Sequence, residues 1–203
     1  MLPEAVGVMM LVVEAFDRLH IPYLIAGSMA SALHGVTRST IDADMVAEIE
    51  PEQAQALAEM LKDDFYADEG MILDAVVHRS SFNLIHLKTM FKVDIFVCKE
   101  RPFDQAQFQR REEQVFSIEP DQKAFVATAE DIILAKLELY RLGGEVSDRQ
   151  WRDVLGVFKV QVGRQFPVMI QVFLLNTWAL FRALLLGFPY PIPRLFIELG
   201  FTM

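Results

Sequence analysis

The chain has 203 residues, of which 53% are hydrophobic and 23% charged, and its formal net charge is -9. This composition excludes general disorder, and the length permits one compact domain with a helical annex. The acidic balance excludes a general attraction to phosphate backbones, so a nucleic-acid partner would need a local basic patch. Cys98 is the single cysteine, which excludes an intramolecular disulfide and makes a cytoplasmic location the default.

Helices and strands are expected to alternate through the first half of the chain. Apolar residues at helical spacing after Pro3 predict an amphipathic helix, and Glu14 and Asp17 interrupt its apolar stretch, which argues against a secretory signal. The expected elements are a helix over 3–19, a strand over 21–26, a helix over 28–34, a strand over 41–49, helices over 51–62 and 71–77, and antiparallel strands over 82–87 and 91–98.

The second half of the chain is expected to be mainly helical. A polar helix over 103–113 and a last strand over 114–118 would complete a core that spans 1–118. In the C-terminal region, 119–203, Thr128 begins a helix that Gly143 and Gly144 end, and Ser147 or Asp148 caps another. The predicted fold class is therefore α/β or α+β, with a small mixed sheet, flanking helices and a helical C-terminal region.

Three aspartates in strand-like segments are the main chemical signal. Asp42 and Asp44 are separated by one residue, so a strand would direct both to one face, and Asp94 lies in the apolar run KVDIFV. Carboxylate oxygens are the ligands that Mg²⁺ or Mn²⁺ prefers, and aspartate is depleted in strands, so the three predict a metal site. The alternatives are solvated acids at a strand end and an Asp94 that merely pairs with Lys92.

A glycine and a serine stand between the first predicted strand and the following short helix. Gly27 allows the backbone to approach a phosphate closely, and Ser28 offers a hydroxyl and an N–H group at the start of the helix. The pair therefore predicts an anion-binding turn.

Taken in order, these motifs resemble the nucleotidyltransferase superfamily, the DNA polymerase beta-like group that includes minimal and abortive-infection or toxin-type members. The family pattern is hG[GS], then [DE]h[DE], then h[DE]h, where h is a hydrophobic residue. The chain has IAGS at 25–28, DAD at 42–44 and VDI at 93–95, so the resemblance covers roughly residues 20–100.

The resemblance implies a role for each matching residue. Asp42 and Asp44 would bind a divalent metal, Mg²⁺ or Mn²⁺. Asp94 would complete the metal site and activate the acceptor hydroxyl. Gly27 and Ser28 would bind the triphosphate of an NTP.

Two later segments, EDIILAKLELYR and SDRQWRDVLGV, resemble the KL...R...RD..D helices of toxin-type members. Lys136 would then contact the triphosphate, and Asp153 would lie at the edge of the site. The alternative for Lys136 is an exposed helix lysine that lies along the surface. Arg38, just before DAD, would bind phosphate or cap Asp42.

The last 44 residues, Val160–Met203, have an unusual composition. Their charged residues are Arg164, Arg182, Arg194 and Glu198. The stretch 166–190 is long enough to cross a bilayer, but an arginine in its second half and the PYPIP run after it disfavour a membrane helix. An aberrant or oddly packed tail, a helical packing annex, and a membrane or partner attachment remain open.

The predicted function is Mg²⁺-dependent transfer of a nucleotidyl group from an NTP to an acceptor hydroxyl. The acceptor would be RNA, such as tRNA, or a partner protein, and the chain would fit a toxin-antitoxin pair with a cognate toxin or antitoxin. The alternatives are a catalytically silent nucleotide-binding or protein-interaction module of the same fold, and a membrane-associated protein.

Overall fold

The computed structural model describes residues 3–34, 42–117, 122–144 and 146–161. These residues belong to a compact unit, Met1–Gln161, and the rest of the chain forms a second unit, Val162–Met203. Arg38 and the apolar tail after residue 161 therefore lie outside the described residues. No helix within the described ranges is long and apolar enough to cross a membrane.

Helices and strands alternate along the described chain, much as the sequence pattern predicts. The helices are α1 (Pro3–Arg18), α2 (Gly27–Leu33), the 3-10 helix η1 (Pro51–Gln53), α3 (Ala54–Leu61), α4 (Glu69–Val77), α5 (Pro102–Arg110), α6 (Ala129–Leu142) and α7 (Asp148–Gln161). The strands are β1 (Tyr23–Ile25), β2 (Asp42–Ala47), β3 (Phe65–Tyr66), β4 (Ser81–His86), β5 (Lys92–Val97), β6 (Glu112–Ser117) and β7 (Gln122–Val126).

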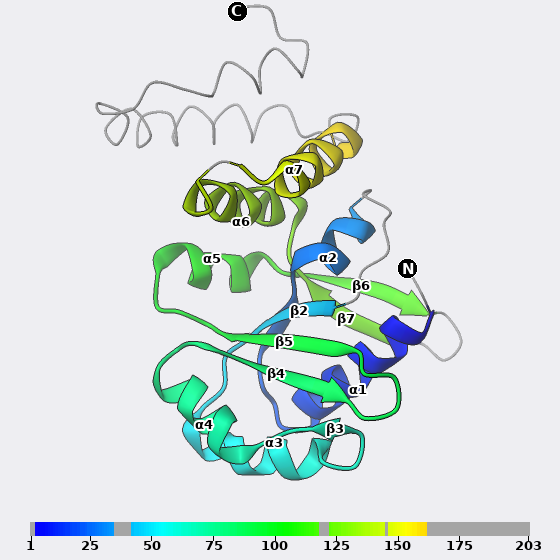
Figure 1. Cartoon of the computed structure of the whole chain (residues 1–203), viewed down its shortest axis with the longest axis vertical. Helices are drawn as coiled ribbons and strands as arrows, with labels where there is room; N and C mark the ends of the chain where they lie inside the picture. Colours follow the sequence, from blue (N-terminus) through cyan, green and yellow to red (C-terminus); the bar gives the residue numbers. More distant parts are fainter. Residues whose placement is uncertain (1–2, 35–41, 118–121, 145, 162–203) are drawn as a thin grey trace, which may run out of the picture. The chain divides into compact units, whose positions relative to one another are not determined.

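The strands form one seven-stranded mixed sheet in the order β3-β4-β5-β2-β1-β7-β6 (Figure 1). Strand β2 is antiparallel to β1 and parallel to β5, while β4 is antiparallel to β5 as predicted. A mixed sheet with flanking helices confirms the predicted fold class.

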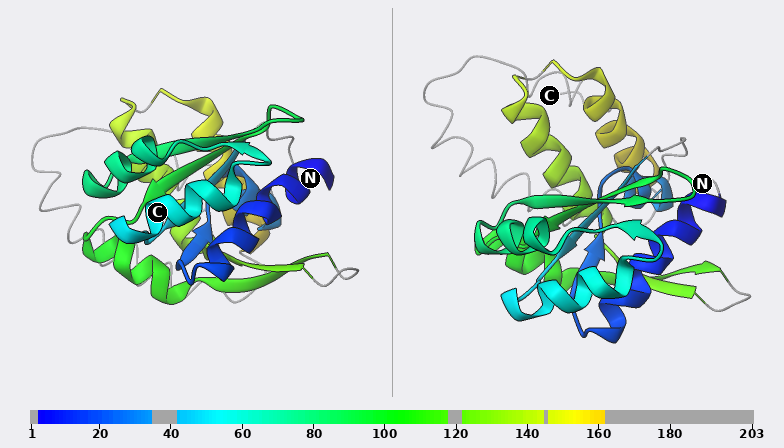
Figure 2. Two further views of the ribbon diagram at one scale, coloured as in Figure 1. Left: turned by 90° about the horizontal axis from the view of Figure 1, so that it is seen from below. Right: turned by 60° about the horizontal axis from the view of Figure 1, so that its bottom comes forward.

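The two faces of the central strands differ in burial because side chains alternate along a strand. Ala43, Met45 and Ala47 of β2 are fully buried, whereas the residues between them are partly exposed. Helices α3 and α4 lie below the strands in Figure 1, and α2, α6 and α7 lie above them. In Figure 2, α1 lies beside α3, and both helices contribute buried apolar side chains such as Phe16 and Leu57.

One strand was not predicted. We expected the strand after α5 to be the last, but Gln122–Val126 also forms a strand, β7, which lies between β6 and β1. Antiparallel pairing of β6 with β7 adds Gln122–Val126 to the sheet, after the last strand that was predicted. Only Ala124 and Val126 of this short segment are buried. Its strand conformation depends on pairing with two neighbours rather than on a strong local pattern.

Buried polar contacts fix the start of α6. The Thr128 hydroxyl accepts a hydrogen bond from the N–H of Asp131 and donates one to its carboxylate. The Arg110 guanidinium donates two hydrogen bonds to the same carboxylate, which is fully buried. Helices α5 and α6 are therefore joined by a charge-assisted bidentate contact.

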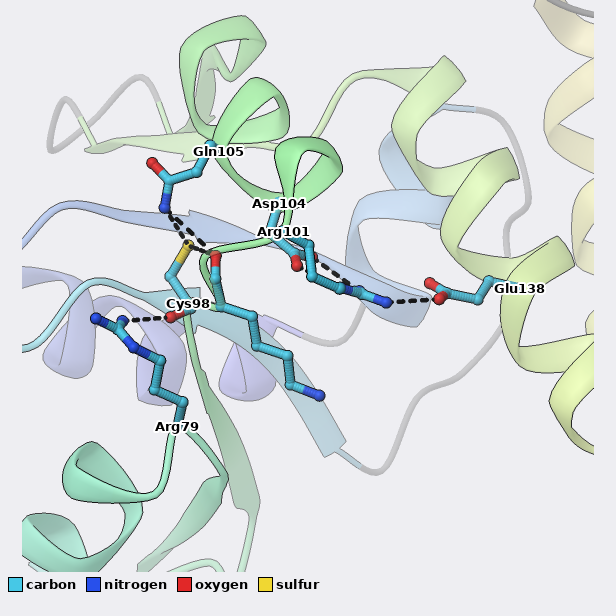
Figure 3. Close-up of polar contacts among 7 residues, drawn as sticks. Arg79, Cys98, Arg101, Asp104, Gln105 and Glu138 are labelled. Atoms are coloured by element: carbon cyan, nitrogen blue, oxygen red, sulfur yellow. Dashed lines mark hydrogen bonds and ion pairs between the residues drawn. The ribbon is translucent and has the colours of Figure 1, made fainter. Parts of the chain in front are cut away.

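A second contact joins these helices near the end of β5. The Arg101 guanidinium binds Asp104 of α5 and, at 2.6 Å, Glu138 of α6 (Figure 3). On the other side of the strand end, Arg79 donates a hydrogen bond of 2.8 Å to the carbonyl oxygen of Cys98. Two arginines at the two ends of α5 thus hold α6 in place.

Candidate active site

Parallel pairing of β2 with β5 brings the three aspartates together. The register places Asp44 directly opposite Asp94 and Asp42 directly opposite Lys92. Residues that face each other in neighbouring strands lie on the same face of the sheet. The three carboxylates therefore share one face, together with the ammonium group of Lys92.

Asp44 is partly buried, and the charges around it shift its pKa. Burial raises the pKa of Asp44 above its ordinary value, and the negative charges of Asp42 and Asp94 raise it further. The positive charge of Lys136 and a hydrogen bond from the backbone N–H of Ser28 act in the opposite direction. The environment of Asp44 is thus one in which added positive charge is strongly favoured.

Gly27 is required by its backbone conformation and by its contact with Asp44. Its φ is +58°, in the left-handed region that side chains disfavour. A Cβ atom at this position would lie 1.8 Å from Oδ2 of Asp44, far inside van der Waals contact. The glycine thus lets the Asp44 carboxylate lie against the first turn of α2, where Ser28 is 8% exposed.

A Gly27→Ala substitution is expected to displace the Asp44 carboxylate. If the site is catalytic, transfer should fall by about 100-fold, the cost of a misplacement on the order of 1 Å. Gly144→Ala is a matched control, because Gly144 also has a positive φ, +74°, but has no atom within 4 Å of the added Cβ. Steady-state rates of both folded variants test this expectation, and equal rates would show that the contact with Asp44 is unimportant.

Both oxygens of Asp94 already have partners. Nζ of Lys92 lies 2.7 Å from Oδ2, and Nδ2 of Asn83 lies 3.4 Å from Oδ1. Asn83 is directly opposite Asp94 on β4 and is exposed. Asn83 was not predicted as a site residue. Its signal was its place between Phe82 and Leu84, since a polar residue between two buried ones marks the open face.

Lys136 and Asp153 form a buried ion pair between α6 and α7. Nζ of Lys136 lies 2.8 Å from Oδ2 of Asp153, and the two side chains are 10% and 6% exposed. This burial excludes the alternative in which Lys136 lies along the surface. The positive charge of Lys136 lowers the pKa of Asp44, so the lysine influences the acids electrostatically while it pairs with Asp153.

The sequence matches no model of a protein family and no curated protein. The structure, however, is similar to solved nucleotidyltransferases. The antibiotic-resistance factor ANT(2'')-Ia gives a TM-score of 0.56 at 16% identity, covering 91% of this chain and 96% of that one. The lincomycin-bound lincosamide antibiotic adenylyltransferase LnuA gives 0.50 at 14% identity, covering 79% and 98%.

An antigenic nucleotidyltransferase-like protein from Paracoccidioides brasiliensis gives a TM-score of 0.53 at 20% identity, covering 77% of this chain and 76% of that one. This chain has the nucleotidyltransferase fold. The resemblance seen in the sequence motifs is thereby confirmed at the level of the fold.

The nucleotidyltransferase fold places donors of the right chemistry for a hard divalent ion on one sheet face. Asp42, Asp44 and Asp94 offer carboxylate oxygens, and Gly27 leaves room for the carboxylate of Asp44. As the side chains stand, no three acidic, histidine or cysteine residues in the described ranges are grouped to hold a metal ion together. Oδ2 of Asp94 is paired with Lys92 instead.

Proposed function

We propose that the protein is a nucleotidyltransferase that moves a nucleotidyl group from an NTP to an acceptor hydroxyl. The observation that carries the proposal is the register that sets Asp44 opposite Asp94, with Asp42 on the same face and the Gly27–Ser28 turn against Asp44. The fold shared with the adenylyltransferase LnuA supports it.

The carboxylates would hold the metal and receive the proton. Asp42 and Asp44 would bind Mg²⁺ or Mn²⁺, and Asp94 would be the third ligand. The bound metal would offset the charge of the triphosphate and of the attacking oxygen. Asp94, whose side chain is 17% exposed, would also accept the proton of the acceptor hydroxyl as that oxygen bonds to the α-phosphorus and pyrophosphate leaves.

The cationic and N–H groups beside the acids would bind the triphosphate. The backbone at Gly27 and Ser28 approaches Asp44 without a side chain in between. A nucleotide held by a metal ion on the Asp44 carboxylate would therefore contact the same turn. Lys136 would add positive charge from the α6 side, with Asp153 fixing the direction of its ammonium group.

The acceptor is a separate part of the proposal. RNA such as tRNA, or a partner protein of a toxin-antitoxin pair, stays a prediction. The net charge of -9 means that RNA would need a local basic surface. Because LnuA was solved with lincomycin, a small hydroxyl-bearing compound is a further acceptor class to include.

The test is a transfer assay with NTPs labelled on the α-phosphate. The full chain is incubated with each NTP, Mg²⁺ or Mn²⁺, and one of three acceptors, which are total RNA, lysate protein and lincomycin. We expect label to pass from at least one NTP to one acceptor class, and the Asp42→Asn variant to be inactive. If the wild-type protein binds an NTP but transfers no label, the silent-module alternative, which the pairing of Lys92 with Asp94 favours, replaces this proposal.

A further inference from the structure

Lys92 lies on the same face of the sheet as the three carboxylates and contacts one of them. It is the first residue of β5, directly opposite Asp42, and its ammonium group lies 2.7 Å from Oδ2 of Asp94. The hydrogen bond to Asp94 is the main reason that the pKa of Lys92 is raised, and the charges of Asp42 and Asp44 add to the effect. The ammonium group of Lys92 therefore contacts Asp94 directly and is influenced by the charges of the other two acids.

A lysine ammonium group and a divalent metal ion compete for the same carboxylate, because both are cations attracted by its negative charge. We propose that Lys92 holds Asp94 in the metal-free protein, must release it when a divalent metal binds, and so sets the metal affinity of the site. The inference rests on the proposed three-carboxylate metal site. In this proposal Lys92 is a positioning residue, which acts on the metal through Asp94.

The surroundings of Lys92 allow this exchange. Its side chain is 42% exposed, so the flexible stem can carry the ammonium group into solvent. Asp94 would keep its contact with Asn83, because the amide binds the other oxygen. A metal ion bound between the aspartates would stabilise the negative charge of Asp44, which burial and the two acidic neighbours disfavour.

Two substitutions at Lys92 should shift metal affinity in opposite directions. Lys92→Met removes the competing cation and keeps the length of the side chain, so Mn²⁺ should bind more tightly, by roughly three- to tenfold, the scale of a partly exposed ion pair. Lys92→Arg should bind Mn²⁺ more weakly than wild type, because a guanidinium group can hold a carboxylate with two hydrogen bonds.

The experiment is a calorimetric titration of the chelator-treated full chain with Mn²⁺, together with thermal unfolding in chelator and in Mn²⁺. The matched control is Lys88→Met, since Lys88 lies between β4 and β5, is 77% exposed and pairs with Asp64 at 3.4 Å rather than with one of the three aspartates of the site. We expect the Lys92→Met protein to melt lower than this control in chelator and to gain more stability from Mn²⁺.

The outcomes separate this inference from the proposed function. A folded Lys92→Met protein that binds Mn²⁺ no more tightly than wild type overturns the inference, even if the wild-type protein transfers nucleotides. Absence of Mn²⁺ binding in the wild type and both Lys92 variants overturns it as well, since Lys92 would then be a permanent counter-ion. Tighter binding by Lys92→Met supports it, even if no acceptor is labelled.

Discussion

Replacing Asp44 with asparagine is expected to abolish nucleotidyl transfer and also to raise the melting temperature of the metal-free protein. Asparagine has nearly the same shape and keeps an oxygen that can accept the hydrogen bond from the N–H of Ser28. It removes a negative charge that burial and two neighbouring acids disfavour. The loss of a metal ligand should lower the transfer rate by about 1000-fold, the scale of one lost electrostatic contact at a reaction centre.

The stabilisation by Asp44→Asn should depend on pH in a defined direction. The folded state raises the pKa of Asp44 above the unfolded value of 3.8, so the fold favours the protonated carboxyl. The stability contributed by this group is fully present below 3.8 and is lost as the pH rises through the folded pKa. The melting temperature of the variant should therefore exceed that of wild type most at neutral pH and little in acid.

Calorimetric scans in chelator at several pH values measure this difference. Asp64→Asn is the control, because Asp64 pairs with exposed Lys88 away from the site, and it should not follow the same pH dependence. Added Mn²⁺ should stabilise the wild type and reverse the order of melting temperatures. A variant that melts below wild type in chelator at neutral pH would show that Asp44 is stabilising as an anion, contrary to this account.

Replacing Asp153 with alanine is expected to destabilise the fold by about 3 to 5 kcal/mol, the typical cost of leaving one member of a buried ion pair without its partner. The pair joins α6 to α7, and both side chains are almost completely buried. Lys136 would keep its charge in a poorly hydrated place. Urea unfolding measures the loss, and a change below about 1 kcal/mol would show that water or another group replaces Asp153.

The double variant Lys136→Met with Asp153→Leu separates stability from binding. Apolar residues in place of both partners should restore much of the stability, because no uncompensated charge remains. The affinity of the double variant for NTP should stay below that of the wild type, since the positive charge of Lys136 is gone. Glu14→Ala, which breaks the exposed pair with Arg18, is the control and should leave both stability and NTP affinity unchanged. Restored affinity in the double variant would remove Lys136 from the proposed binding site.

The sequence by itself determined the local geometry of the site. Alternation in the segment that became β2 placed Asp42 and Asp44 on one face, because the side-chain period of a strand is two residues. The glycine before Ser28 marked the turn into α2, where a left-handed backbone is needed. These features depend only on neighbouring residues, so the printed sequence is sufficient to predict them.

Only the tertiary structure decided which distant groups meet. Parallel pairing of β2 with β5 set Asp94 opposite Asp44, and packing of α7 on α6 buried Lys136 with Asp153. Strand β7 likewise exists because β1 and β6 pair with it. Strand order and register arise from the burial of whole sheet faces and from contacts between residues far apart in the chain. Local periodicity carries no record of either. The pair of Lys92 with Asp94 is different, because the two residues share one face of the same strand and the sequence already offered their contact as an alternative.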